Sequence, residues 1–131
     1  MAGYSKRSLP EKLGIKEGTE IGILNSPPDY DQTLTPLPGG VSRSKKLKES
    51  MEFIQFFTKE RNQLLEKFPD LMKHLAPRGI LWISWPKGSS KIKTDLNENV
   101  VRDIGLANGM VDIKVCAVDE IWSGLRFAFR R

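Results

Sequence analysis

The sequence predicts a three-layer α/β fold built on a mainly parallel sheet of five or six strands, with an antiparallel strand pair near the carboxyl terminus. Short apolar runs alternate with two amphipathic helical segments, which is the order expected of a sheet with helices on its faces. The run 79–85 is apolar at all but one position and typical of a strand buried on both faces. The segment 124–130 alternates leucine and phenylalanine with arginine and alanine, the period of two of a half-buried strand.

The amino-terminal half contains two strands separated by a long connection. The pattern over residues 8–14 predicts a short helix, with Ser8 as its cap, Pro10 in its first turn and Gly14 at its end. Residues 19–24 form the first core strand. The prolines at 27 and 28 exclude a helix immediately after it, and residues 33–40 predict a connection with at most one helical turn. Dense aromatic residues over 51–57 favour a strand over a helix.

The carboxyl-terminal half continues the alternation. Residues 59–75 carry apolar side chains on one helical face, with Pro69 expected to kink or restart the helix. Strand 79–85 follows and ends at Pro86. A second amphipathic helix covers 96–107, and residues 111–118 form another strand. Right-handed crossovers make the earlier strands parallel, whereas the short gap before 124–130 favours a hairpin.

Size and composition limit the classes of protein. With 131 residues and a net charge of +5, the chain predicts one globular domain over residues 9–131 after a flexible tail at 1–8. A single cysteine excludes an internal disulfide and suits a reducing compartment. Residues 1–7 lack the apolar core of a signal peptide, and no apolar run is long enough to span a membrane. We therefore expect a cytoplasmic protein without membrane contact.

The loop after strand 79–85 is the best candidate for a binding site. Lysines, serines and the start of a helix can together hold a phosphate or a carboxylate. The residues of this candidate anion site are Lys87, Ser89, Ser90, Lys91, Lys93, Thr94 and Asp95. The loop lacks the glycine and lysine spacing of a P-loop, and the alternative is a solvated loop that only caps the helix. The N-cap itself could be Thr94, Asp95 or Asn97.

A second group of side chains follows other strand ends. At the carboxyl edge of a parallel sheet these residues would line a shared pocket. The candidate pocket residues are Asn25, Tyr30, Trp85, Asp119, Trp122 and Ser123. Core packing is the alternative for the tryptophans, and it is the better interpretation of Trp82, whose neighbours are apolar. Asp119, Glu120 and Ser123 join the pocket only if their hairpin turn folds towards this edge.

Several chemistries are disfavoured by the residues present. The only histidine, His74, falls on an amphipathic helix, and the only cysteine, Cys116, falls within a strand. One histidine and one cysteine make no metal set of the usual spacing and disfavour a catalytic triad. No pattern predicts a bound cofactor. A basic run, Arg43, Lys45, Lys46 and Lys48, predicts either a solvated edge or, with the lysine loop, weak binding of nucleic acid.

Three segments resemble a known bacterial family. They are Trp82-Ile83-Ser84-Trp85-Pro86-Lys87, Thr94-Asp95-Leu96 and Val118-Asp119-Glu120-Ile121-Trp122-Ser123-Gly124-Leu125. With them the chain, from about Lys12 onward, resembles the family named domain of unknown function 3052. That family has no established function, so this resemblance implies no activity.

A wider resemblance is to the Rossmann-like class of S-adenosylmethionine-dependent methyltransferases. Leu75-Ala76-Pro77-Arg78-Gly79 is similar to the leucine-lysine-proline-glycine-glycine turn of that class. By this likeness, segment 124–130 would insert between strands 79–85 and 111–118. The class carries an acidic residue and a glycine-rich turn after its first strand, where this chain has Ile23-Leu24-Asn25-Ser26-Pro27-Pro28. The acidic ribose ligand of its second strand has no counterpart near Val41-Ser42-Arg43.

These observations favour a non-catalytic domain that binds a small anionic molecule or a protein partner at the carboxyl edge of the sheet. One alternative is a degenerate methyltransferase-like enzyme, as the second resemblance implies. The other is weak nucleic-acid binding through the basic loops.

Overall fold

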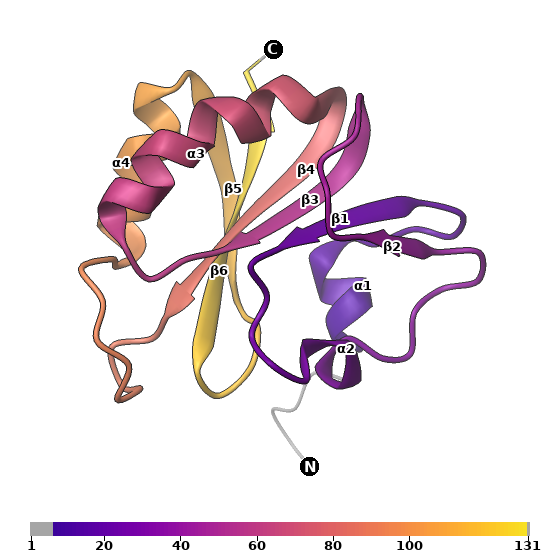
Figure 1. The fold of residues 1–131 in the computed structure, drawn as a ribbon, viewed down its shortest axis with the longest axis horizontal. Helices are drawn as coiled ribbons and strands as arrows, with labels where there is room; N and C mark the ends of the chain where they lie inside the picture. The colour runs from indigo at the N-terminus through magenta and orange to yellow at the C-terminus, as the bar shows by residue number, and fades with distance from the viewer. Residues whose placement is uncertain (1–6, 131) are drawn as a thin grey trace.

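Six strands form one mixed sheet in the order β2-β1-β3-β4-β6-β5 (Figure 1). The computed structural model describes residues 7–130, and the predicted flexible tail lies almost wholly outside them. The parallel strands are β1 (Glu20–Leu24), β2 (Ser42–Ser44), β3 (Met51–Phe57) and β4 (Leu75–Pro86). Strand β6 (Trp122–Phe129) lies antiparallel between β4 and β5 (Met110–Ala117). The predicted α/β class and the insertion of the last strand are both confirmed.

Helices lie on both faces of this sheet (Figure 1). Helices α3 (Arg61–His74) and α4 (Glu98–Ala107) bury their apolar sides on one face, against side chains such as Ile54, Leu81 and Phe127. The short helices α1 (Leu9–Leu13) and α2 (Tyr30–Thr33) belong to a second core on the other face, with Phe53 and Trp82. No helix within residues 7–130 is long and apolar enough to cross a membrane.

The two cores meet in strand β3 because its side chains alternate between the faces. Ile54 and Phe56 point into the core beneath α3 and α4, while Phe53 and Phe57 belong to the other core. Burial on both faces explains why this run is almost continuously apolar. Its one buried amide, Gln55, accepts a hydrogen bond from the hydroxyl of Tyr30 at 2.7 Å and donates to the hydroxyl of Ser84 at 3.1 Å. Burial of Gln55 without these partners would be unfavourable.

Several element boundaries differ from the prediction. Strand β2 was not expected, because its three residues carry no apolar alternation; β1 provides its hydrogen-bonding partners. Helix α3 continues through Pro69, so the proline does not restart it. Strand β4 begins at Leu75, directly after the helix, rather than at Gly79. The N-cap of α4 is Asn97, whose side chain accepts from the N–H of Val100 at 2.9 Å.

Both edges of the sheet are irregular or short. Strand β2 pairs with β1 over three residues only. At the other edge, the pairing of β5 with β6 shifts register between Asp112 and Lys114. The bulge at this point leaves Ile113 without a partner opposite it, and half of its surface is exposed.

Candidate functional site

The strand order reverses between β1 and β3. From β1 the chain moves outward to β2 and then returns across β1 to β3. In open α/β sheets, the crevice outside the carboxyl ends of the strands at such a reversal is the usual place for a ligand. Here the two strand ends lead into Asn25 and Thr58.

A cleft of about 650 Å³ opens at this point. We call it the edge cleft. Loops that follow four different strands build it, which gives it walls from distant parts of the sequence. Its lining residues are Asn25, Pro27, Pro28, Tyr30, Thr33, Thr58, Lys59, Glu60, Gln63, Ile92, Asp119, Ile121 and Trp122. The volume is in the range of ordinary small-molecule sites.

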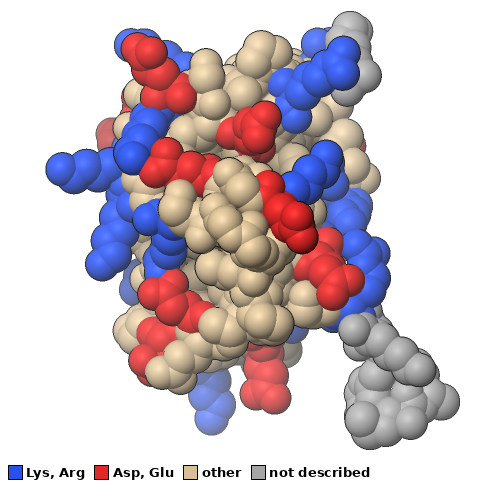
Figure 2. All heavy atoms as spheres, turned by 90° about the vertical axis from the view of Figure 1, so that its right-hand side faces the viewer, with Lys and Arg blue, Asp and Glu red and all other residues tan. Residues whose placement is uncertain are grey.

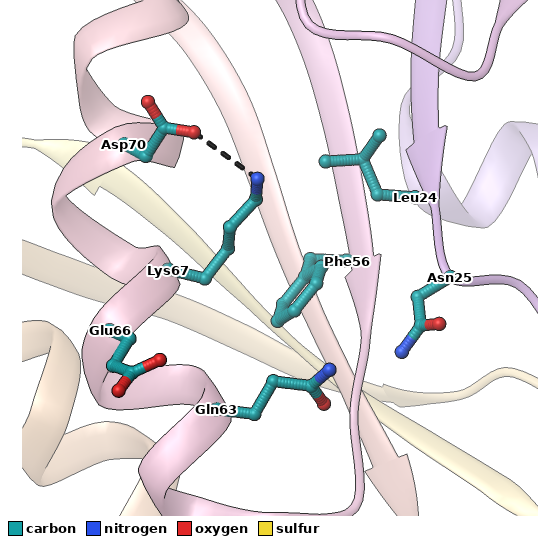
Figure 3. A pocket seen from close by; sticks show the side chains of 7 residues that line it. All are labelled: Leu24, Asn25, Phe56, Gln63, Glu66, Lys67 and Asp70. Atoms are coloured by element: carbon teal, nitrogen blue, oxygen red, sulfur yellow. Dashed lines mark ion pairs between the residues drawn. The ribbon is translucent and has the colours of Figure 1, made fainter.

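A second cleft of about 590 Å³, the α3 cleft, adjoins the first (Figure 3). It shares Asn25 and Gln63 with the edge cleft, and it is also lined by Leu24, Phe56, Glu66, Lys67 and Asp70. Side chains of α3 form one wall, and Leu24 and Asn25 of the β1 end lie opposite them (Figure 3). The ammonium of Lys67 pairs with Asp70 at 3.2 Å along this wall.

Asn25 holds the boundary between the two clefts. Its φ of 61° is left-handed, a conformation in which asparagine is tolerated better than most residues. Its side-chain N–H donates to the carbonyl oxygen of Phe57 at 2.8 Å and so links the ends of β1 and β3. Asparagine thus provides the backbone conformation for which a glycine is usually required, while its amide occupies the space that glycine would leave open.

Aromatic rings close the inner side of the edge cleft. Tyr30, Phe57 and Trp122 contact edge to face, with ring centroids 4.8 Å and 5.1 Å apart. Only 2% of the surface of Tyr30 is exposed, and burial raises the pKa of its phenol far above the ordinary value. Tyr30 is therefore a neutral group that supports the cleft. Trp122 is half-buried and presents part of its ring to the cleft.

The remaining polar groups are held by short-range hydrogen bonds. The hydroxyl of Thr58 contacts the side-chain oxygen of Gln63, and the N–H of Glu60 donates to that hydroxyl at 3.2 Å. The carboxylate of Asp119 accepts from the N–H groups of Ile121 and Trp122, both at 2.8 Å, and so shapes the β5–β6 turn. The side-chain amide N–H groups of Gln63 remain available to a ligand.

Carboxylates outnumber cations around the two clefts. Glu60 and Asp119 line the edge cleft with Lys59, and Glu66 and Asp70 line the α3 cleft with Lys67. The region therefore carries a formal negative charge, although the whole chain is basic. Such a surface attracts a cationic or zwitterionic molecule and repels an anion.

The structure brings together four of the six predicted pocket residues. Asn25, Tyr30, Asp119 and Trp122 line the edge cleft. Trp85 does not: only 4% of its surface is exposed, and it packs into the core beneath α3 and α4. Ser123 pairs across the strands with Trp85 and is likewise absent from the cleft lining.

The candidate anion loop folds on itself. Ser90 donates to the carbonyl of Lys87 at 2.7 Å, and Thr94 donates to the carbonyl of Lys59 at 2.7 Å. Asp95 accepts the first N–H of α3, that of Arg61, at 2.7 Å and does not cap α4. Three residues extend from the loop as exposed side chains, Ser89, Lys91 and Lys93. These hydrogen bonds join residues of the protein to one another and do not test anion binding, so the anion site stays a prediction.

Reasoning from the sequence missed the contribution of the segment after β3. Thr58, Lys59, Glu60 and Gln63 all line the edge cleft. The signal was present, because this segment follows a strand that the sequence predicts to be parallel. Ile92 of the lysine loop also reaches the edge cleft, although it was not among the candidate residues.

The basic run at β2 is partly neutralised. Arg43 pairs with Asp31, and Lys48 pairs with Glu20 at 2.6 Å. Figure 2, which views the molecule from the β2 side, shows basic and acidic side chains interspersed.

Half-buried Cys116 has a thiol whose pKa is raised by burial. Among residues 7–130, no group of three histidine, cysteine or acidic side chains is placed to hold a metal ion.

No family model matches the sequence, and no curated protein is detectably similar to it. Solved structures are similar. The fold is Rossmann-like, of the methyltransferase type. An S-adenosylmethionine-dependent methyltransferase from Aquifex aeolicus aligns with 89% of this chain and 85% of its own, at a TM-score of 0.60 and 14% identity.

Two further structures show the same architecture. The ribosomal protein L11 methylase of Lactobacillus delbrueckii subsp. bulgaricus aligns with 94% of this chain and 76% of its own, at a TM-score of 0.59 and 12% identity. A possible exported protein from Bordetella parapertussis aligns with 94% of this chain and 66% of its own, at a TM-score of 0.68 and 10% identity. At these identities the likeness concerns the fold alone.

Proposed function

We propose that this protein binds a small molecule of the S-adenosylmethionine class in the edge cleft. The observation that carries the proposal is the surplus of carboxylates around the strand reversal, in a chain that is otherwise basic. S-Adenosylmethionine carries a sulfonium cation and an amino acid zwitterion, which suit such a surface better than a phosphate does. The similar structures include enzymes named for this cofactor, which supports the same ligand class.

Three side chains are assigned to the ligand. The half-buried ring of Trp122 offers an apolar surface that also attracts a cation. Glu60 is exposed at the N-cap of α3 and makes no capping hydrogen bond, so its carboxylate is free to face a positive charge. Gln63 supplies amide donors, since only its oxygen is engaged by Thr58.

The competing hypothesis is the small anionic ligand expected from the lysine loop. The two hypotheses differ in the charge of the ligand, which makes them separable by one panel of compounds. The panel contains S-adenosylmethionine, its uncharged-sulfur product S-adenosylhomocysteine, ATP and inorganic phosphate. We expect thermal stabilisation by the first two compounds, of about 2.7 kcal/mol at a hundred times the dissociation constant.

A pair of variants tests the assignment of Glu60. Glu60→Gln removes one negative charge from the edge cleft, and Glu17→Gln removes one from an exposed position outside both clefts. An exposed charge a few ångströms from the sulfonium contributes about 1 kcal/mol, so Glu60→Gln should weaken S-adenosylmethionine about fivefold and S-adenosylhomocysteine much less. Calorimetric titration measures both. Stabilisation by ATP or phosphate without S-adenosylmethionine, or no response to any compound, would overturn the proposal.

A further inference from the structure

The sheet face opposite α3 and α4 is open at its β5 end. At the carboxyl end of helix α1, Gly14 lies against Ile80 and Arg126: a Cβ added there would be 3.1 Å from the side chain of Ile80 and 3.7 Å from that of Arg126. Beyond this point a shallow cavity of about 520 Å³ lies over β5, β6 and the start of β4. Its floor includes Val111, Ile113 and Ala128.

Three arginines line this cavity and no acidic residue does. Arg78 comes from β4, Arg126 from β6, and Arg130 directly follows β6. A fourth cation, Lys114 of β5, stands directly opposite Arg126 in the register of the sheet. We call these four residues the arginine face. It is separate from the edge cleft, with which it shares no lining residue.

The arginine face has no counter-charge in the part of the chain that the structure describes. None of its four cations forms an ion pair or a hydrogen bond with residues 7–130. The Nε of Arg126 is even buried without a hydrogen-bond partner. By contrast, Arg43, Lys67 and Arg102 each contact a carboxylate. Like charges directly opposite each other destabilise a sheet, so a negatively charged partner bound at this surface would relieve the repulsion between Arg126 and Lys114.

The chemistry of the face selects phosphate groups. The planar guanidinium donates two parallel hydrogen bonds to a phosphate, and three such groups occupy one surface here. Arg126 and Arg130 are four residues apart along an extended strand, which separates their Cα atoms by about 14 Å. A chain of phosphates offers a separate group to each of these spaced arginines.

We propose that the arginine face binds the phosphodiester backbone of single-stranded nucleic acid. The apolar part of the cavity lining includes Val111, Ile113 and Ala128, and half-buried Phe129 is its one aromatic residue. Because one ring can stack on one base at most, recognition rests mainly on the backbone and is independent of sequence. The basic run at β2 is not part of this surface.

Fluorescence anisotropy with a labelled oligonucleotide of about 12 residues tests the proposal. Between 50 and 200 mM salt, the logarithm of the association constant should fall linearly with the logarithm of the salt concentration. The expected slope is about −2 to −3, the value for three or four phosphates on a single strand. The double variant Arg78→Gln/Arg130→Gln should flatten that slope by about 1.4 and weaken binding at low salt about tenfold or more. Both side chains are exposed, so its thermal midpoint should stay at the native value.

The matched control is Lys45→Gln/Lys46→Gln, which removes the same charge from exposed side chains outside the arginine face. Equal weakening by both double variants would show attraction to net charge alone and would overturn the proposal. So would the absence of oligonucleotide binding, including the case in which inorganic phosphate alone binds in an arginine-dependent way. The single variant Lys114→Gln is a second test, and it should flatten the salt dependence of the association constant by about 0.7 in slope.

Discussion

The packing of helix α4 against Phe127 leaves no room for a Cβ atom at Gly105. Gly105 lies in α4, where alanine is intrinsically favoured by about 1 kcal/mol. A Cβ there would come within 2.0 Å of the ring of Phe127, which is fully buried. Overpacking of this kind costs about 1–3 kcal/mol, so Gly105→Ala should lower the free energy of unfolding despite the helix propensity.

Urea denaturation measures this effect. Gly88→Ala is the control, because a Cβ at Gly88 meets no atom within 4 Å. Its free energy of unfolding should stay within about 0.5 kcal/mol of the wild-type value. A Gly105 variant at least as stable as the wild type would show that Phe127 moves aside without cost.

Asn25 provides a test of backbone strain beside the edge cleft. Asn25→Gly and Asn25→Ala both lose the hydrogen bond to Phe57, but only alanine retains a Cβ at a φ of 61°. The alanine variant should therefore be less stable than the glycine variant by about 1 kcal/mol. At the exposed helical position Asn62 the order should reverse, since glycine is the poorer helix former. Thermal denaturation of the four variants measures both orders.

Trp85 shows a limit of single-residue prediction. The strand 79–85 is apolar on both sides, so its pattern has no period that says which face a given side chain meets. Trp85 points into the core beneath α3 and α4 rather than into the edge cleft. Arg126 and Arg130 show the converse. Their alternation with buried residues was visible in the sequence, but the cavity that they line also contains residues of β4 and β5, which no local pattern of β6 could predict.

Among the elements, helix α3 takes a cap from the segment that leads into helix α4. Asp95 precedes α4 but accepts the first N–H of α3, whereas Asn97 caps α4. Asp95→Ala should cost about 1 kcal/mol and speed amide exchange in the first turn of α3. Asn97→Ala should have the same effect on α4 instead. Hydrogen exchange resolved by residue distinguishes the two, and faster exchange in α4 after Asp95→Ala would contradict the assignment.

Helix α4 and strand β5 are joined by an ion pair that predicts a pH dependence. The side chain of Arg102 donates to the carboxylate of Asp112 at 2.9 Å, and this hydrogen bond lowers the pKa of Asp112. A carboxyl group with a lowered pKa stabilises the fold above its unfolded pKa, about 3.9, and loses that contribution as the pH falls through the folded pKa.

Arg102→Gln should therefore be less stable than the wild type at pH 5–7, and the difference should shrink below about pH 4. Urea denaturation from pH 7 to pH 2.5 follows this difference. The control is Arg61→Gln, which removes the same charge from an exposed residue outside this pair. A difference that stays constant down to pH 2.5 would contradict the role of Asp112.

At this scale the sequence predicted most elements but not the smallest. Long periodic segments such as α3 and β3 were recognisable because their own side chains supply the burial. Strand β2 was not, since Ser42–Ser44 has no apolar pattern and exists because β1 offers an unpaired edge. Similarly, the edge cleft combines four loops, and only the assembled sheet shows that Gln63 and Ile92 meet there.

For the whole molecule, the two cores should unfold together. Strand β3 contributes alternate side chains to both, so neither core survives without it. Trp82 and Trp85 report on opposite cores. Trp122 packs against the same core as Trp82, so Trp85→Phe leaves fluorescence from that core only, whereas Trp82→Phe/Trp122→Phe leaves Trp85 of the other core. In both variants we expect the unfolding curves from tryptophan fluorescence and from circular dichroism to coincide. Separate midpoints in either variant would show that the cores are independent.

The shape of the two sheet edges has a consequence for the behaviour of the chain in concentrated solution. A long, flat edge invites a second molecule to add a strand, and repeated addition leads to fibrils. One edge here offers only the three residues of β2, and the other is bent by the bulge at Ile113, beside the charged Lys114. Neither edge is a good template for another strand, so we expect the molecule to resist polymerisation although Ile113 and Val115 are exposed.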